Sequence, residues 1–203
     1  MYTITPAAPA DVLSAAEVLA QAFEGDPVMA AVTGRPAPAA ALLARLFAPL
    51  LRSGPLPLGG VDLARRSDDG SIAGVAVWEP PGSRSHLLRQ AVEVPAFLAA
   101  LGLRGLSRAL HTQGLLARHR PAARHWYLAQ IGATAAARGT GVGSALLEAR
   151  LARVDAEGAA AYLESSNERN RRLYARAGFR ETAPIAGIDG ARPMGMWRAP
   201  VTP

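Results

Sequence analysis

Three glycines alternate with other residues in the segment Arg138–Ser144, which reads Arg-Gly-Thr-Gly-Val-Gly-Ser. Apolar residues that follow, among them Val142 and Leu146, have the spacing of one helix face, so the glycines open a predicted helix. The first amides of a helix have no acceptor within it, and the helix dipole makes that end positive. Glycine also lets the backbone approach a ligand closely. The segment therefore predicts a phosphate or diphosphate site, and the alternative is a turn that only caps the helix.

Two common nucleotide-binding motifs fit this segment poorly. A Walker loop needs a lysine after its last glycine, and the chain contains no lysine. A dinucleotide fingerprint needs Gly-x-Gly-x-x-Gly, and here the third glycine is in the wrong place. Glu164 does lie about where a ribose-binding acid would be expected, but too few residues follow it for a doubly wound domain. An NAD(P)-binding oxidoreductase remains a weaker alternative.

The composition narrows the chemistry further. The 203 residues include no cysteine, which excludes disulfides, thiolate metal sites and an acyl-cysteine intermediate. The four histidines show no ligand spacing, so we expect no metal. The net charge of +6 comes from scattered arginines without interleaved aromatic residues, so we expect no nucleic-acid partner.

The N-terminus and the apolar stretches give no membrane signal. Met1–Asp11 lacks a basic stretch followed by an apolar run, so no secretion signal is expected. The longest apolar stretches, Ala39–Leu51 and Ala96–Leu103, are shorter than the ~20 residues of a membrane span. We therefore expect a soluble, cytoplasmic protein without a membrane partner.

The periodicity of apolar residues predicts a mixed sheet in an α/β protein of the α+β type, because a hairpin precedes the alternation of strands and helices. The predicted strands are Tyr2–Thr5, Val61–Arg65, Ile72–Trp78, His125–Ala133, Ala160–Glu164, Phe179–Thr182 and Arg192–Arg198. The predicted helices are one that follows Asp11, then Val28–Val32, Ala39–Leu51, Ser85–Arg118, Gly139–Glu157 and Asn167–Ala177. The long helical segment should be interrupted at Pro95 and near Gly102–Gly105.

Two segments in this order resemble the signatures of the GNAT N-acetyltransferases. The run from Ile131 to Leu147 is similar to the family's coenzyme-binding motif, Arg/Gln-x-x-Gly-x-Gly/Ala, with Arg138, Gly141 and Gly143 in register. The run Tyr162–Phe179 resembles the second signature, in which a strand leads into a helix that carries Asn and Tyr and ends at Gly-Phe.

Shorter matches extend the resemblance over nearly the whole chain. The stretches His119–Pro121, His125–Leu128 and Arg192–Arg198 are similar to the puromycin N-acetyltransferase branch of the family. The resemblance implies the GNAT fold: one domain over 1–203 with a mostly antiparallel sheet of six or seven strands flanked by helices. It also implies that the strands at 125–133 and 160–164 run parallel and splay apart around the coenzyme. A coenzyme-binding core at about 123–183 would follow a helical insert at about 83–122.

The resemblance further implies direct transfer of the acetyl group of acetyl-CoA to a primary amine of a small molecule. The residues implied to contact the coenzyme are Ile131, Gly132, Ala133, Arg138, Gly139, Thr140, Gly141, Val142, Gly143, Ser144, Asn167, Asn170 and Tyr174. Gly132 suits a bulge that would aim the amides of Ile131–Ala133 at the thioester oxygen. Asn167 could instead cap its helix.

The catalytic pair implied by the resemblance is Tyr174 and Glu164. Tyr174 occupies the position of the general acid, and its alternative role is a packed core aromatic. Glu164 is the candidate base, with a structural carboxylate paired to an arginine as the alternative and Glu79 in reserve. Glu24 and Asp26 could attract a cationic acceptor, although ordinary helix-end charges are the simpler interpretation.

Several features stay open at this level. A non-catalytic sensor of acyl-CoA would keep the same fold without turnover. The helical insert could build the acceptor pocket, a homodimer contact or a solvated bundle. Nothing in the sequence identifies the acceptor amine.

Overall fold

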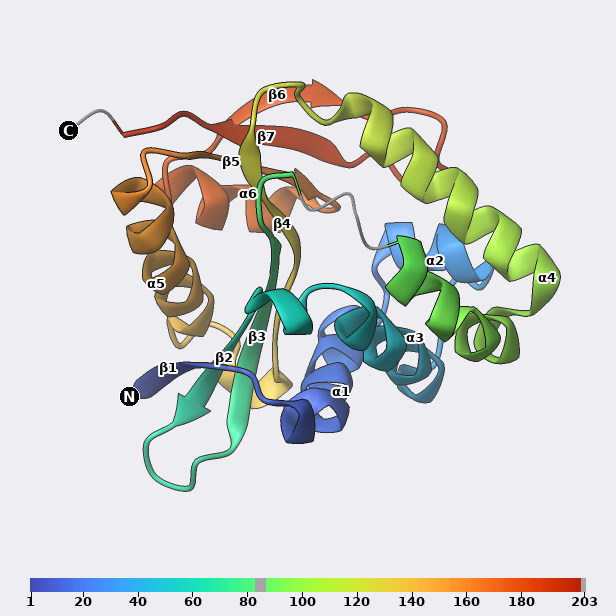
Figure 1. Cartoon of the computed structure of the whole chain (residues 1–203), viewed down its shortest axis with the longest axis horizontal. Coiled ribbons are helices and arrows are strands. Elements are labelled where there is room, and N and C mark those ends of the chain that lie inside the picture. The colour runs from blue at the N-terminus through green and yellow to red at the C-terminus, as the bar shows by residue number, and fades with distance from the viewer. Residues whose placement is uncertain (83–86, 202–203) are drawn as a thin grey trace.

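The computed structural model describes residues 1–82 and 87–201, and it contains a twisted sheet of mixed direction (Figure 1). The strands are β1 Tyr2–Pro6, β2 Val61–Arg66, β3 Ile72–Glu79, β4 His125–Ala133, β5 Ala160–Ser165, β6 Arg180–Pro184 and β7 Met194–Arg198. Their order across the sheet is β1-β2-β3-β4-β5-β7-β6. All neighbours pair antiparallel except β4 and β5, which pair parallel. The predicted fold class and the parallel pair are therefore confirmed.

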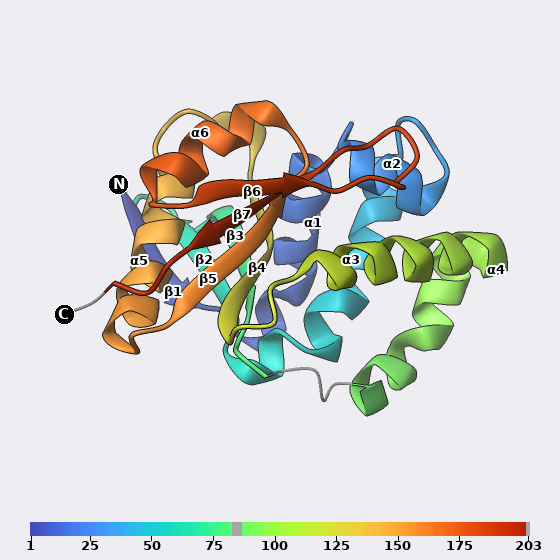
Figure 2. The same ribbon diagram turned by 90° about the horizontal axis from the view of Figure 1, so that it is seen from above.

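Helices cover both faces of this sheet, as Figures 1 and 2 show from two directions. They are α1 Val12–Ala22, α2 Pro27–Thr33, α3 Ala40–Ser53, α4 Leu87–His119, α5 Val142–Ala156 and α6 Glu168–Arg176. One apolar core joins α5 and α6 to the sheet, and a second joins α1 and α3 to the opposite face. Within the described residues, no helix has the length and apolar character needed to cross a bilayer.

Buried side chains of α5 fix this helix against the sheet. Leu146 and Leu147 are fully buried between the helix and the sheet. Arg150, also on α5, is buried too, and its guanidinium makes a bidentate ion pair with Asp62 on β2 at 2.7 and 2.8 Å. Removing either partner would leave a buried charge without its counter-charge. The pair therefore fixes the helix, and the loop before it, against the sheet.

The long helical segment is present, with one break rather than two. Helical backbone continues through Pro95, but Gly102 has φ of 66° and ψ of 176°, which lie far from helical values. The interruption expected at Pro95 is therefore wrong, because one proline removes a single intrahelical hydrogen bond and a helix can absorb that loss by bending. The predicted start at Ser85 lies outside the described residues. The two halves of α4 turn around α3 and α2, as Figure 2 shows.

Candidate active site

The glycine-rich segment forms a turn that ends at the beginning of α5. Gly139 and Gly141 have φ of 80° and 88°, the left-handed region that favours glycine. Within the described residues, the amides of Val142, Gly143 and Ser144 have no hydrogen-bond acceptor, and the first bond into the helix comes from Ala145 to the Gly141 carbonyl. The turn thus presents consecutive free N–H groups at the positive end of a helix.

Side chains of the same segment hold the turn in place. Arg138 donates a 3.0 Å hydrogen bond to the carbonyl oxygen of Gln21 at the end of α1. Thr140 donates from its hydroxyl to the Ala137 carbonyl at 2.7 Å and also bonds the hydroxyl of Tyr2 at 2.7 Å. The side chains of Arg138 and Thr140 therefore hold the turn in position within the fold.

The third glycine of the motif has a packing role. A Cβ at Gly143 would come within 3.1 Å of Leu173 on α6, whereas a Cβ at Gly139 or Gly141 would meet nothing within 4 Å. Val142 is buried in the core beneath the turn. Gly139 and Gly141 therefore leave open space for a ligand, and Gly143 lets two helices approach.

The parallel strands β4 and β5 separate beside this turn. Their pairing runs from His125 with Ala160 to Leu128 with Leu163, and it ends there. The Thr134 amide donates to Ala73 on β3, and strand amides alternate in direction, so those of Ile131 and Ala133 point away from β3. These two amides thus face the side on which β5 has diverged.

The bulge in β4 lies at a different residue from the one expected. Trp78 pairs with Leu128 and Val77 with Gln130, which leaves Ala129 as the extra residue. Gly132 instead pairs regularly with Val75, and a Cβ there would approach Ala22 of α1 to 2.5 Å. The bulge predicted at Gly132 is therefore wrong: this glycine is required by the close packing of α1 on the sheet.

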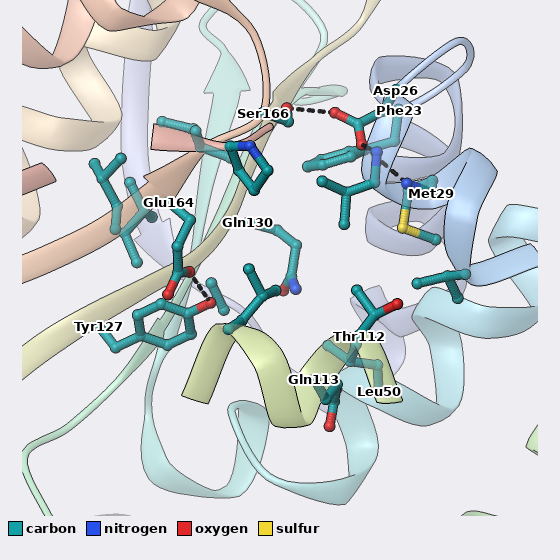
Figure 3. Close-up of a pocket in the computed structure, with 18 of the residues that line it drawn as sticks. Phe23, Asp26, Met29, Leu50, Thr112, Gln113, Tyr127, Gln130, Glu164 and Ser166 are labelled. Atoms are coloured by element: carbon teal, nitrogen blue, oxygen red, sulfur yellow. Dashed lines mark hydrogen bonds between the residues drawn. The ribbon is translucent and has the colours of Figure 1, made fainter. Parts of the chain in front are cut away.

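A cavity of about 430 Å³ extends from the gap between β4 and β5 toward α2, α3 and α4. Figure 3 shows Glu164 and Tyr127 at one end, Gln130 near the middle, and Leu50, Met29 and Thr112 toward the other end. The side formed by β4, β5 and α6 is lined by Leu128–Ile131, Leu163, Glu164, Ser166, Asn167, Asn170 and Tyr174. The predicted coenzyme gap and a deeper pocket are therefore continuous.

Glu164 contributes a buried carboxylate to this cavity, with 5% of its side chain exposed. Its Oε2 accepts a 2.6 Å hydrogen bond from the Tyr127 hydroxyl, and its Oε1 has no hydrogen-bond partner among the described residues. Burial raises the pKa of Glu164 to about 6, although the bond from Tyr127 and the charge of Arg120 oppose that rise. A carboxylate with this pKa is ionised at neutral pH and can accept a proton.

Arg120 and Glu79 surround the Tyr127 end of the cavity. The Arg120 guanidinium lies 3.4 Å from the Tyr127 ring centroid and 3.3 Å from Glu79 Oε2, while its Nε is 3.9 Å from Glu164 Oε1. Glu79 is more exposed, at 35% of its side chain, and is engaged by this arginine. Of the two candidate bases, Glu164 therefore has the buried, partly unpartnered carboxylate.

Tyr174 lines the same cavity from α6. Its ring packs against Phe179 at 6.3 Å in an edge-on arrangement, so the predicted packing role is real. Its hydroxyl has no hydrogen-bond partner within 1–82 and 87–201, and burial together with the nearby charge of Asp26 raises its pKa. The phenol therefore stays protonated at neutral pH, and its hydroxyl can donate a hydrogen bond to a ligand in the cavity.

Some of the remaining polar candidates make structural hydrogen bonds, and some line the cavity. The Asn167 side chain accepts a 3.0 Å bond from the Asn170 amide and so caps α6, yet both asparagines line the cavity. Asp26 also lines it, but its carboxylate is taken up by the amides of Val28 and Met29 and by the Ser166 hydroxyl. Glu24 is exposed and does not line the cavity.

Most residues that line the cavity were missed by sequence reasoning, among them the polar side chains of Arg120, Tyr127 and Gln130. The strand pattern gives the face on which Tyr127 lies, but its partner Glu164 follows only from the β4–β5 register. Within the described part of the chain, no group of three metal-ligating side chains is present.

Comparison with known proteins identifies the family. Residues 63–179 match the sequence profile of the acetyltransferase (GNAT) family, which is more than half of the chain and includes the turn, β4, β5 and α6. The chain belongs to the GNAT acetyltransferase family. The chain is therefore an acyltransferase by family, and the oxidoreductase alternative is wrong because the sheet is mixed rather than doubly wound.

Solved GNAT structures resemble the whole chain. A crystal structure from Corynebacterium glutamicum, described as histone acetyltransferase HPA2 and related acetyltransferase, is 33% identical over 100% of this chain and 98% of its own, with a TM-score of 0.76. Arylalkylamine N-acetyltransferase 2 from Aedes aegypti is 18% identical over 98% of each chain, with a TM-score of 0.65. The polyamine N-acetyltransferase of Drosophila melanogaster is 17% identical over 97% and 98%, with a TM-score of 0.63. The last two share the fold.

Proposed function

We propose that this GNAT protein transfers the acetyl group of acetyl-CoA directly to a primary amine of a small molecule. The observation that carries the proposal is the position of two titratable groups in one cavity: the carboxylate of Glu164, one oxygen of which accepts no hydrogen bond, and the phenol of Tyr174, which has no hydrogen-bond partner within the described residues. A base and an acid are the two groups that direct transfer to an amine requires. Without cysteine, the chain offers no thiol for an acyl intermediate.

The residues present suit acetyl-CoA. The free amides of Val142, Gly143 and Ser144 and the open space at Gly139 and Gly141 fit a diphosphate. Arg138 adjoins this turn in the chain, and two asparagines at the start of α6 line the cavity. When bound, acetyl-CoA supplies the acetyl group and departs as the free thiol.

Groups of the chain itself would accept and donate the protons of this reaction and stabilise the charge that develops on the acyl oxygen. Glu164 Oε1 accepts a proton from the amine, and Tyr127 holds the carboxylate from the other oxygen. The amides of Ile131 and Ala133 donate to the acyl oxygen as it gains charge. The Tyr174 phenol gives a proton to the departing sulfur, a transfer that its raised pKa makes dependent on close placement.

We also infer a single domain over 1–203, in which about 123–183 bind the coenzyme and the helical insert helps to form the acceptor pocket. Support comes from Phe97, Thr112 and Leu116 of α4, which line the cavity together with β4 and β5.

The test combines ligand binding and turnover. Acetyl-CoA and NAD(P) are added in parallel thermal melts, where a ligand at a hundred times its Kd adds about 2.7 kcal/mol of stability. Release of free thiol is then followed over a panel of primary amines. We expect stabilisation by acetyl-CoA alone and amine-dependent thiol release; binding without release over the panel would indicate an acyl-CoA sensor instead.

A further inference from the structure

Two buried acceptor atoms of the cavity have no hydrogen-bond partner among the described residues. They are Oε1 of Glu164 and Oε1 of Gln130, and Figure 3 shows the Gln130 side chain reaching into the space between Glu164 and Met29. A buried acceptor without a donor costs free energy, so native structures rarely keep one empty. Both atoms therefore call for a ligand that donates hydrogen bonds. A primary amine carries two N–H hydrogens, or three when it is protonated.

The charges of the cavity provide for one cation. The charged side chains along its described lining are Asp26, Glu79, Arg120 and Glu164. Asp26 already accepts from two backbone amides and from a serine hydroxyl, and Glu79 is bonded to Arg120. Among these described side chains, Glu164 alone has a buried carboxylate oxygen that accepts no hydrogen bond, and its nearest cation, Arg120 Nε, lies 3.9 Å away, so this oxygen is the place for one ammonium group.

The wall away from Glu164 is mostly apolar and partly aromatic, and Thr112 is among its polar side chains (Figure 3). Phe23 and Phe47 both line this wall, with ring centroids 5.4 Å apart and planes tilted by 54°, and aromatic side chains offer large apolar surfaces to a ligand ring. Thioethers such as that of Met29 also pack well on rings. The other apolar side chains of this wall are Val28, Val32, Leu46, Leu50, Leu58, Phe97, Ala109, Leu116 and Ala117.

Resting on the proposed function, we propose that the acceptor is a primary monoamine with an apolar, aromatic body. Its amino group lies between Glu164 and Gln130, and its body packs against the wall that contains Phe23, Phe47 and Met29. A diamine or polyamine would bring a second ammonium group to a wall whose buried carboxylate, Asp26, already accepts hydrogen bonds from two backbone amides and a serine hydroxyl, so the second charge would gain little there.

Two matched pairs of acceptors test this class. Butylamine and butane-1,4-diamine differ by one ammonium group, and 2-phenylethylamine and ethylamine differ by one ring. We expect kcat/KM to fall about tenfold or more from butylamine to the diamine, and to rise about tenfold or more from ethylamine to 2-phenylethylamine. A diamine as good as butylamine, or a ring without benefit, would overturn the proposal while leaving amine acetylation intact.

Binding of the same four amines is measured by thermal melts in saturating coenzyme A, so the pocket is tested even without turnover. The same order of stabilisation supports the acceptor class. A larger shift with the diamine than with 2-phenylethylamine contradicts it.

Gln130→Ala tests the second contact. We expect KM for 2-phenylethylamine to rise about tenfold with kcat within about threefold, because the carboxamide binds the acceptor and takes no part in proton transfer. Folding stability should not fall, since Gln130 Oε1 has no donor among the described residues to lose. Glu17→Ala, at an exposed side chain on α1 outside the cavity, is the control and should leave both constants unchanged. An unchanged KM in Gln130→Ala, or a loss of stability with it, would refute the assignment.

Discussion

The Tyr127 hydroxyl donates a 2.6 Å hydrogen bond to one carboxylate oxygen of Glu164, and the other oxygen accepts no hydrogen bond from the described residues, with Arg120 Nε 3.9 Å away. The two residues lie on neighbouring parallel strands, where those strands begin to separate. Arg120 covers the ring of Tyr127. Glu164 is thus oriented by Tyr127 through one oxygen, while its other oxygen is buried and accepts no hydrogen bond from the described residues.

Tyr127→Phe should shift the acid limb of the pH profile. The pKa of Glu164 is raised to about 6 by burial, and the bond from Tyr127 lowers it. Because the base must be ionised, kcat/KM should fall more steeply as the pH drops through about 6. Loss of the bond should move that limb upward by about one to two pH units, since a hydrogen bond to a charged group contributes about 1.5–3 kcal/mol and one pKa unit corresponds to about 1.4 kcal/mol. A limb that stays in place would show that Tyr127 does not tune the base.

Glu164→Gln should lower kcat by about 10²–10⁴-fold, the range typical of a lost general base. Coenzyme affinity, measured by calorimetry, should stay within about threefold because Glu164 is distant from the turn at Gly139–Ser144 in the proposed complex. Glu79→Gln is the comparison, because Glu79 is more exposed and bonded to Arg120. If Glu79→Gln costs as much activity as Glu164→Gln, the assignment of the base is wrong.

Tyr174→Phe should reduce turnover sharply while coenzyme affinity stays nearly intact. The Tyr174 hydroxyl has no partner in the described part of the chain, so its removal breaks no protein hydrogen bond there and the ring still packs on Phe179. Steady-state kinetics and a thermal melt separate the two roles. Full turnover in the variant would remove Tyr174 from the mechanism and leave it as a core residue.

Gly141→Val should weaken coenzyme binding about tenfold or more, because a side chain there occupies the open space above the free amides. It also strains a residue at φ of 88°. Gly158→Val is the matched control, since Gly158 has φ of 59° and open space at the far end of α5. Both variants should lose about 1–2 kcal/mol of stability. Equal coenzyme affinity in the two variants would contradict a diphosphate site at the turn.

Much of the fold follows from local pattern. Apolar periodicity and turn residues predict each strand within about two residues of its position, as for His125–Ala133. The glycine turn is predictable too, because positive φ at Gly139 and Gly141 is a property of the residues themselves.

The parts that sequence reasoning missed depend on contacts between distant segments. From the sequence alone Gly132 suits a bulge, but in the structure it packs closely against Ala22 of α1. The bulge at Ala129 depends on the register in which β4 pairs with β3. The contact between Tyr127 and Glu164 likewise depends on the β4–β5 register. The local conformational preferences of the residues do not determine these strand registers and contacts.

A crystal structure of the protein with coenzyme A would test the central claim most directly. We predict diphosphate oxygens within hydrogen-bonding distance of the amides of Val142, Gly143 and Ser144, with the thiol end between β4 and β5 near Tyr174. A bound coenzyme whose diphosphate lies elsewhere, with those three amides left to solvent, would contradict that claim.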